Sequence, residues 1–257
     1  MTAPLLQLDG VSKRFGGVAA VQNVTADIHA GEIVGLIGPN GAGKTTLVNV
    51  ITGVHRATSG TVKFEGQDVT AQRPFEAARR GLSRTFQIVQ PFPEMTVREN
   101  VAAAALFAAG AESRAVAMRD ADEQLEFVGL KPLASEPARS LTLPNRKRLE
   151  LAKSLAMKPR MLLLDEVNAG LNPSEIDRAL DLIRAIAARG VTIVIIEHLM
   201  KVVLGLSQRV LVLHHGELVA EGTPDEIVAD DRVIEAYLGD RFAKRGKPAD
   251  DLAETAP

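Results

Sequence analysis

Uninterrupted apolar runs recur along the chain, and each is followed by polar residues. The clearest runs are residues 33–37, 161–164 and 191–196. A strand of a parallel sheet is covered by helices on both faces, so its side chains are apolar on both sides and do not alternate. Segments with apolar residues at helical spacing, such as 146–157 and 173–189, lie between these runs. This order predicts an α/β fold around a parallel sheet.

The first 28 residues show a different pattern, which predicts an N-terminal antiparallel β subdomain. Short apolar stretches alternate with turn-forming residues, as they do in hairpins. The stretches are residues 5–11, 18–21 and 24–28, separated by Gly16-Gly17 and Asn23. We therefore expect three short strands here. A further hairpin is expected over residues 209–220, with its turn at His215-Gly216.

Helical patterns dominate the middle of the chain. Two prolines shortly after residue 87 indicate a loop. Thr96 and Glu99 then form a capping box at the start of an alanine-rich helix, and residues 115–128 predict a second amphipathic helix. We interpret residues 88–143 as a helical lobe inserted into the α/β body.

Composition and charge narrow the class of protein. The 257 residues carry a net charge of -2, which gives no electrostatic reason to expect a nucleic-acid partner. The absence of cysteine excludes disulfides and thiolate metal ligands. The N-terminus lacks a signal-peptide pattern, and the alanine-rich stretch 101–111 is too short to span a bilayer. We expect one cytoplasmic domain, residues 1–240, with a flexible tail at 241–257.

A glycine-rich loop between the run 33–37 and a second apolar segment, 47–51, carries the most specific chemistry. Glycine reaches positive φ without strain, so the loop can aim several backbone N–H groups at one point, where the following helix dipole also acts. Lys44 can reach the β- and γ-phosphates of a nucleotide, and the Thr45 hydroxyl can bind magnesium. The alternative is a glycine-rich turn without a ligand. The predicted nucleotide-binding residues are Gly38, Pro39, Asn40, Gly41, Ala42, Gly43, Lys44, Thr45 and Thr46.

Acidic residues and a histidine stand where two other apolar runs end. Asp165 and Glu166 follow the run 161–164, and His198 stands shortly after the run 191–196. Ligands of open α/β sheets bind at the C-terminal ends of the strands. We expect Asp165 to hold magnesium, directly or through water, and Glu166 to orient or deprotonate the attacking water. His198 is expected to sense the γ-phosphate; a purely structural histidine is the alternative.

Phe15 is the candidate contact for the base of the nucleotide. It precedes the strand that leads into the loop, in a chain with one Tyr and no Trp. Its ring could stack on a purine, or it could be an ordinary core residue. The residues alone leave both interpretations open.

Taken in order, these segments resemble the ATP-binding subunit of an ABC transporter over residues 5–239. The resemblance implies a P-loop NTPase fold with a RecA-like parallel-sheet core, and ATP and Mg2+ as ligands. Gln87 resembles the loop glutamine that contacts magnesium and links the γ-phosphate site to the helical lobe. The other matching positions are Phe15 for the adenine-stacking aromatic residue, 38–45 for Walker A, 165–166 for Walker B, 169–172 for the loop at the dimer interface, and His198 for the switch histidine.

The resemblance also implies partners and a place in the cell. Members of the family act as a head-to-tail dimer of ATPase subunits on transmembrane permease subunits, at the cytoplasmic face of the plasma membrane. Residues 84–87, 94–100, 169–173 and 236–239 resemble the branch that imports branched-chain amino acids. An external solute-binding protein would then be an indirect partner. Relatives in that branch also serve amides, urea and other small solutes, so the solute stays open.

One motif departs from the family pattern. The usual Leu-Ser-Gly-Gly-Gln signature is replaced by residues 141–145, Leu-Thr-Leu-Pro-Asn, before a helix expected from Arg146. Thr142 keeps a hydroxyl for the nucleotide, but Pro144 has no N–H to donate to a γ-phosphate. We therefore expect a different ATPase subunit as the second member of the dimer. A homodimer that binds phosphate through Thr142 and the helix dipole is the alternative.

Two other functions agree less well with the sequence. A soluble ABC-type ATPase could act as a clamp in DNA repair or on ribosomes, but such proteins insert long coiled coils or fuse two ATPase halves, which this chain does not. A small-molecule kinase would have no reason to carry Gln87 and His198 at these strand ends. The sequence therefore favours ATP-driven import.

Overall fold

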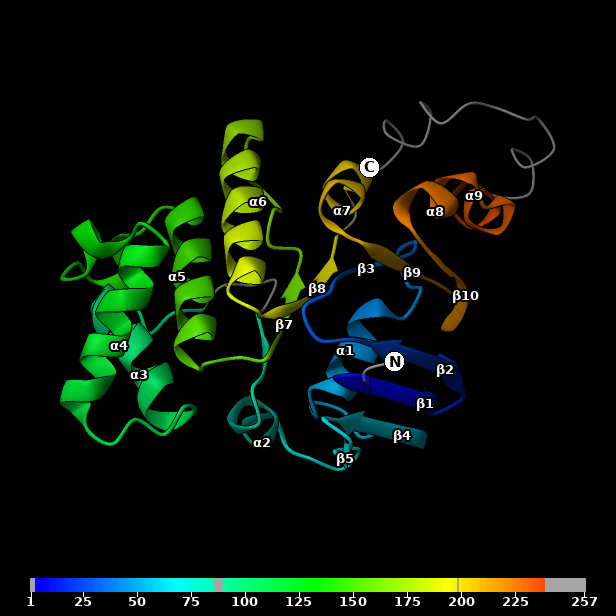
Figure 1. The fold of residues 1–257 in the computed structure, drawn as a ribbon, viewed down its shortest axis with the longest axis horizontal. Coiled ribbons are helices and arrows are strands. Elements are labelled where there is room, and N and C mark those ends of the chain that lie inside the picture. Colours follow the sequence, from blue (N-terminus) through cyan, green and yellow to red (C-terminus); the bar gives the residue numbers. More distant parts are fainter. Residues whose placement is uncertain (1–2, 86–89, 198, 239–257) are drawn as a thin grey trace. The chain divides into compact units, whose positions relative to one another are not determined.

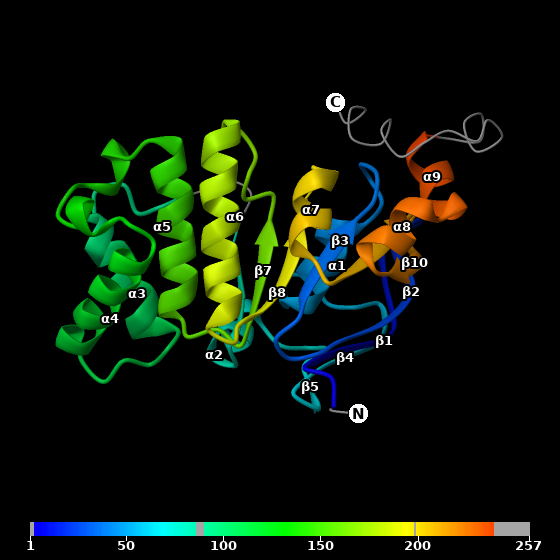
Figure 2. The same cartoon turned by 45° about the horizontal axis from the view of Figure 1, so that its top comes forward.

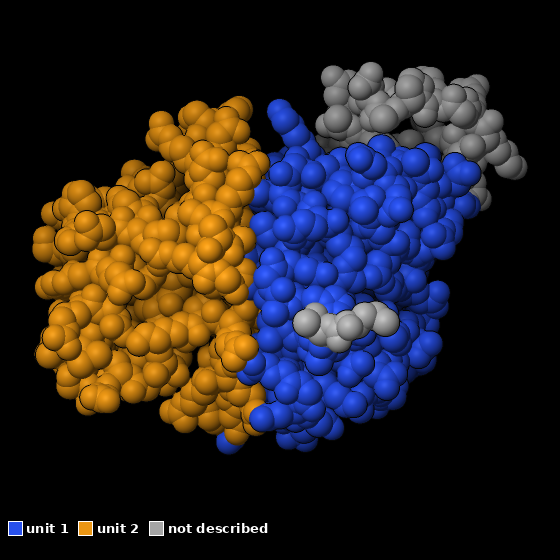
Figure 3. Space-filling model, viewed as in Figure 1, with its two compact units in different colours: residues 1–73, 192–257 blue, residues 74–191 orange. Residues whose placement is uncertain are grey.

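The computed structural model describes residues 3–85, 90–197 and 199–238. Contacts within the chain divide it into two units (Figure 3). Unit 1 consists of residues 1–73 and 192–257, and unit 2 of residues 74–191. In the sequence, unit 2 is thus inserted into unit 1.

An antiparallel sheet begins unit 1 (Figure 1). Its core-facing residues are apolar and alternate with more exposed ones, as expected for a sheet with one buried face. In spatial order the strands are β2 (Val18–Ile28), β1 (Leu6–Phe15), β4 (Ser59–Phe64) and β5 (Gln67–Asp68). The expected antiparallel subdomain is confirmed.

The prediction of three strands before residue 28 was wrong, because the chain forms two longer ones. Asn23 lies inside β2, with φ of 48°, and does not separate two strands. The pairing of β1 with β2 shifts from Val11 opposite Val24 to Lys13 opposite Val21. Asn23 therefore occupies a bulge, where one strand carries an extra residue without ending the pairing.

Parallel strands form the second sheet of unit 1. The apolar run after Glu32 is its central strand, which is buried along its whole length as the pattern predicted. The order is β10 (Glu217–Gly222), β9 (Arg209–His214), β3 (Ile33–Ile37) and β8 (Thr192–Ile196), and only β10 is antiparallel to its neighbour. The helices are α1 (Lys44–Ile51), α7 (Met200–Leu206), α8 (Pro224–Ala229) and α9 (Asp231–Leu238).

Unit 2 contains a pair of parallel strands and a group of helices. β6 (Leu82–Arg84) pairs with β7 (Met161–Asp165), and every residue of β7 is buried. The capping box at Thr96 and Glu99 is confirmed, as is the cap at Asn172. The helices are α2 (Pro74–Arg79), α3 (Val97–Phe107), α4 (Arg114–Phe127), α5 (Leu143–Ala156) and α6 (Pro173–Ala188), with short 3-10 turns at Lys131–Leu133 and Ala138–Ser140. α3, α4 and α5 pack on one another (Figure 2).

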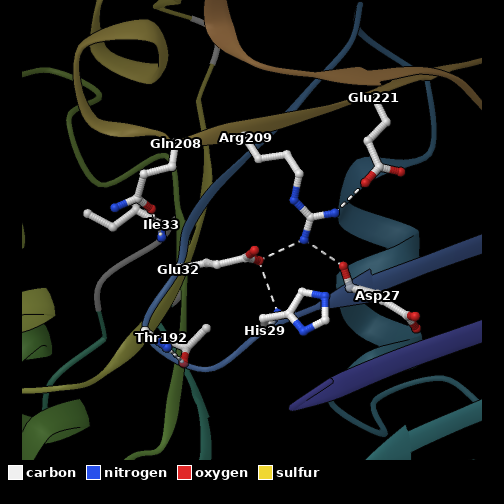
Figure 4. A network of polar contacts seen from close by, with 9 residues as sticks. Asp27, His29, Glu32, Ile33, Thr192, Gln208, Arg209 and Glu221 are labelled. Atoms are coloured by element: carbon white, nitrogen blue, oxygen red, sulfur yellow. Dashed lines mark hydrogen bonds and ion pairs between the residues drawn. The ribbon is translucent and has the colours of Figure 1, made fainter. Parts of the chain in front are cut away.

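A guanidinium group joins the two sheets of unit 1 (Figure 4). Arg209, at the start of β9, donates through Nη2 to Glu32 Oε2 at 2.7 Å and to the Asp27 carbonyl oxygen at 2.6 Å. Its Nη1 pairs with the Glu221 carboxylate on β10. Glu32 Oε2 also accepts the His29 N–H at 3.0 Å, which fixes the turn between β2 and β3. Burial opposes the charged form, but the bonds to Glu32 and Glu221 outweigh it and raise the pKa of Arg209.

Two more side chains beside this network accept hydrogen bonds from backbone N–H groups. Gln208 Oε1 accepts the Ile33 N–H at 2.5 Å, and Thr192 Oγ1 accepts the Gly31 N–H at 2.9 Å. Both bonds satisfy backbone donors in the turn that leads into β3 (Figure 4). The direction in which β3 leaves the turn is therefore fixed by side chains from β8 and from the residue before β9.

We expect Arg209→Ala to lower the free energy of unfolding by about 1–2 kcal/mol. Two carboxylates and a carbonyl oxygen lose a charged donor, and partial exposure of the group reduces the effect. Urea titration measures the change. Arg232→Ala is the matched control, because Arg232 pairs with Asp230 at the surface and should change little. Equal urea midpoints for the two variants would show that the network does not stabilise unit 1.

Candidate functional site

The phosphate loop, residues 38–46, connects β3 to α1 in unit 1. Gly43 is the N-cap residue of α1 at φ of 103°, and no side chain caps the helix. The first N–H groups of α1 have no partners within the helix, so they are directed at whatever binds there. Asn40, Gly41 and Thr45 are exposed on this loop. The loop thus presents backbone donors and a hydroxyl at the surface.

Glycine is required at two positions of the loop because other backbone segments approach it closely. A Cβ on Gly38, which has φ of 147°, would lie 2.1 Å from the Leu213 carbonyl oxygen. A Cβ on Gly43 would lie 2.3 Å from the Ala20 carbonyl oxygen. Both distances are far below any van der Waals contact, so a side chain at either position would displace the strand behind it.

The turn between β9 and β10 supports the loop from behind. The Gly216 N–H donates to the Ala42 carbonyl oxygen at 2.9 Å, and the Gly216 carbonyl accepts from the Gln22 N–H at 2.7 Å. The Gln22 side chain also donates to the His215 carbonyl oxygen at 2.9 Å. Sequence analysis predicted this hairpin but not its role as a support. In the sequence, only Gly216 indicates that this turn lies close to another segment of the chain.

Lys44 is folded back onto the phosphate loop. Its Nζ donates to the carbonyl oxygens of Gly38 at 2.6 Å and Pro39 at 3.1 Å. A Cβ on Gly41 would meet nothing within 4 Å, so the surface beside that residue is open. A cation, uncapped helical N–H groups and open space together fit a polyphosphate.

Phe15 ends β1 and is 44% exposed. The interpretation of Phe15 as a core residue is therefore wrong. The ring meets the His55 ring edge-on, with centroids 5.2 Å apart, and Lys13 Nζ lies 4.9 Å from the ring centroid. An exposed aromatic ring of this kind can stack on a nucleobase.

In unit 2, Asp165 is the last residue of β7 and is 4% exposed. Its Oδ2 accepts from Arg84 Nη2 at 2.6 Å, and its N–H donates to Thr85 Oγ1 at 3.2 Å. Opposite charge stabilises a buried carboxylate that would otherwise be expensive to desolvate. Arg84 was not among the predicted site residues, although its place at the end of the neighbouring strand β6 could have indicated it. Glu166 follows directly at φ of 48°, a strained value for a residue with a side chain.

The signature segment, residues 141–145, differs from its prediction. The helix was expected from Arg146, but α5 begins at Leu143, with Thr142 as an N-cap whose side chain makes no capping bond. Pro144 fits in this first turn because a proline there has no intrahelical N–H bond to lose. Thr142 is exposed, and Arg146 Nε donates to the Leu141 carbonyl oxygen at 2.8 Å.

Lys147 connects α5 to the turn that carries Glu166. Its Nζ donates to the carbonyl oxygens of Val167 at 2.9 Å and Glu166 at 3.3 Å. At the start of the same helix, Leu143 lies so close to Gly170 that a Cβ there would be 3.1 Å from its Cδ2. Lys147 and Leu143 therefore hold the start of α5 against the turn that follows β7.

Two predicted residues, Gln87 and His198, lie outside the described residues. Their positions in the site stay predictions. The strand before His198 ends at Ile196, and Glu197 is 1% exposed.

Two family models match the chain. The model described as ABC transporter matches residues 21–169. The model described as branched-chain amino acid ATP-binding cassette transporter matches residues 217–243. The second match includes β10, α8 and α9, which lie in unit 1 with the phosphate loop.

Curated relatives align over nearly the whole chain. The high-affinity branched-chain amino acid transport ATP-binding protein BraF of Pseudomonas aeruginosa is 39% identical over 254 residues, 93% of this chain and 100% of BraF. The protein LivG of Salmonella typhimurium, named in the same way, is 41% identical over the same shares. A probable LivG of Archaeoglobus fulgidus is 36% identical over 91% of this chain and 95% of its own.

Solved structures agree with the fold. A nucleotide-free ATP-binding cassette from an ABC transporter superposes with a TM-score of 0.83 at 32% identity, covering 92% of this chain and 100% of the cassette. A dimeric cassette in a post-hydrolysis state, bound to ADP and phosphate, gives a TM-score of 0.75 at 26% identity, covering 85% and 98%.

We expect Lys147→Ala to loosen the turn at residues 165–170. Loss of a charged donor to two carbonyl oxygens should speed amide hydrogen exchange there at least about tenfold. Exchange measured by mass spectrometry tests this. Lys153→Ala is the control, because Lys153 lies on the same helix but pairs with Glu150. Unchanged exchange in the Lys147 variant would contradict a tethering role.

Proposed function

The chain belongs to the ATP-binding subunits of ABC transporters, and from this we propose that it powers import of a branched-chain amino acid or a related small polar solute. It is an ATPase of that family. The observation that carries the proposal is the glycine loop that holds Lys44, in a chain about two-fifths identical to transport ATP-binding proteins over 93% of its length. The repair-clamp alternative finds no support, because these relatives are transport proteins.

We assign the nucleotide contacts residue by residue. The backbone N–H groups of the phosphate loop and the Lys44 ammonium bind the β- and γ-phosphates. To do so, Lys44 Nζ exchanges its bonds to Gly38 and Pro39 for phosphate oxygens. Phe15 stacks on the adenine, and its exposure supports this role. Thr142 contributes its hydroxyl to the nucleotide of the second ATPase subunit.

Three residues are assigned to magnesium. The Thr45 hydroxyl and the Asp165 carboxylate are hard oxygen donors of the kind that Mg2+ prefers, and Gln87 is the third assigned ligand. Bound Mg2+ neutralises phosphate charge during transfer. Asp165 binds Arg84 through Oδ2, so we assign Oδ1 to the metal or to its water. Arg84 keeps this carboxylate oriented.

Hydrolysis depends on a base placed beside the attacking water. We assign this role to Glu166. Its backbone has φ of 48°, and its carbonyl oxygen accepts a hydrogen bond from Lys147 Nζ. Both features fix the backbone from which the carboxylate side chain extends. His198 and Gln87 sense the γ-phosphate and complete the catalytic group. General bases of this kind contribute about 100- to 10,000-fold to rate.

Transport requires separate transmembrane permease subunits. In the described part of the chain, no helix is long and apolar enough to cross a membrane. Phe92 is 57% exposed on a loop that Asn100 holds: the Phe92 N–H donates to Asn100 Oδ1 at 2.8 Å, and Asn100 Nδ2 donates to the Phe92 carbonyl oxygen at 3.0 Å. We propose this exposed residue, whose backbone Asn100 holds in place, as a contact for the permease. The subunit then works at the cytoplasmic face of the plasma membrane, with a solute-binding protein as an indirect partner.

We expect Glu166→Gln to keep ATP affinity but to lower ATP hydrolysis by at least about 100-fold. The amide can hold a water molecule but cannot accept its proton. Nucleotide titration and phosphate release measure the two effects. Lys44→Ala is the contrasting variant, because it should weaken ATP binding about 10- to 100-fold. Near wild-type hydrolysis by the Gln variant, assembled with its permease, would exclude Glu166 as the base.

We also expect this chain to hydrolyse ATP slowly alone and faster with a different ATPase subunit. Pro144 cannot donate to a γ-phosphate, and Leu143 keeps the backbone at a distance, so a homodimer would carry this defect in both sites. Steady-state ATPase assays of the chain alone, and with a candidate partner from the same transporter, test the expectation. The double variant Leu143→Gly, Pro144→Gly should raise the activity of the chain alone. High cooperative turnover of the wild-type homodimer, unchanged by a partner, would contradict it.

A further inference from the structure

His55 lies in the short connection between α1 and β4, in unit 1. Its N–H donates to the carbonyl oxygen of Asn49, near the end of α1, at 3.0 Å. Gly53, in the same connection, fits so closely that a Cβ would lie 2.4 Å from the Gln72 carbonyl oxygen. The connection is therefore fixed to one end of the helix whose other end begins at Lys44.

The same connection runs beside the end of β1 that carries Phe15. The Thr58 N–H donates to the Ser12 carbonyl oxygen at 2.7 Å, and Thr58 Oγ1 accepts the Arg14 N–H at 3.0 Å. The rings of His55 and Phe15 meet at an angle of 78°, with their centroids 5.2 Å apart. Aromatic rings in this edge-to-face arrangement attract one another. His55 thus connects the end of α1 to the Phe15 ring.

Lys13 and His55 both contact the Phe15 ring, but they restrict it to different degrees. Lys13 Nζ lies 4.9 Å from the ring centroid, where a cation is attracted to the aromatic system. The long, flexible side chain of a lysine can follow the ring if the ring turns. The imidazole of His55 is short and extends from a fixed backbone, so it restricts the direction of the ring more strongly. Phe15 is still 44% exposed, which leaves surface for a base.

A nucleotide can use the stacking ring and the phosphate loop together only if their separation matches its own length. α1 begins at the phosphate loop, and His55 connects its other end to Phe15. The position of the ring is therefore set relative to the helix that also presents its N–H groups to the phosphates. A side chain that is already held in its binding position loses less freedom when the ligand arrives, and this increases affinity.

We propose that His55 is a positioning residue for the nucleobase: it holds the Phe15 ring in place for stacking, at a fixed position relative to the phosphate loop. The inference rests on the proposed function, since it concerns the same nucleotide. It has a consequence that general stabilisation of the fold would not have. His55 should affect the affinity for ATP but not the affinity for inorganic tripolyphosphate, which has no base.

The test compares His55 variants in their affinities for ATP and for inorganic tripolyphosphate, measured by isothermal titration calorimetry. His55→Ala should weaken ATP binding about 3- to 10-fold, the contribution of an aromatic pair, and leave tripolyphosphate binding unchanged. His55→Phe should restore the affinity for ATP, because it supplies another ring against Phe15. Val54→Ala is the matched control: it changes the exposed neighbouring residue and should alter neither affinity.

A double-mutant cycle with Phe15→Ala shows whether the effect passes through the Phe15 ring. Once this ring is removed, His55→Ala should cause no further loss of ATP affinity. Three results would overturn the proposal: unchanged ATP affinity of His55→Ala, an equal loss for ATP and tripolyphosphate, or full additivity with Phe15→Ala. An equal loss would show that the substitution disturbs the phosphate loop through α1 and does not act on the base.

A measurement without nucleotide separates this inference from the proposed function. The ring current of Phe15 acts on the ring protons of His55, so Phe15→Leu should shift their NMR signals. If wild type binds neither ATP nor tripolyphosphate while this shift is present, the rings are in contact, but the proposed function is overturned and the role of His55 with it. If wild type binds ATP but the shift is absent, only the positioning role is overturned.

Discussion

Close approach of backbone to backbone is the constraint on which the phosphate loop depends. The loop is shaped by the strands behind it, which come nearer than any side chain would allow: Gly43 and Gly216 both face the Ala20 carbonyl oxygen, where a Cβ would lie at 2.3 and 2.9 Å. Because β2 and the β9–β10 turn are pressed against the loop, its amides are oriented before a ligand arrives. Preorganised donors of this kind need no further ordering on binding.

Buried charge is the corresponding constraint in unit 2. Asp165 and Arg84 form an ion pair whose side chains are 5% and 8% exposed. Removing either partner would leave a buried charge uncompensated, which is more costly than the pair itself is stabilising. The pair thus holds β6 and β7 to one arrangement at their C-terminal ends. Lys147 holds the next turn in place, because its Nζ donates to the carbonyl oxygens of Glu166 and Val167.

The sequence predicted what depends on local pattern and missed what depends on contacts between distant segments. The buried strands, the caps at Thr96 and Asn172 and the glycine loop follow from periodicity and from side-chain chemistry within a few residues. The prediction that Asn23 separates two strands was wrong because a bulge and a turn use the same residue types. Only the pairing with β1 distinguishes the two. Arg84 binds Asp165, a residue 81 positions away in the sequence, and no local pattern records such a relation.

Lys44 has hydrogen-bond partners within the loop itself. Its ammonium already donates to the carbonyl oxygens of Gly38 and Pro39, so a phosphate bound by Lys44, as we propose, would replace existing hydrogen-bond partners. The net affinity is then the difference between two satisfied arrangements, and it is smaller than the phosphate contacts alone would give. Under the proposed assignment, the Gly38 and Pro39 carbonyl oxygens compete with any bound phosphate for the ammonium group.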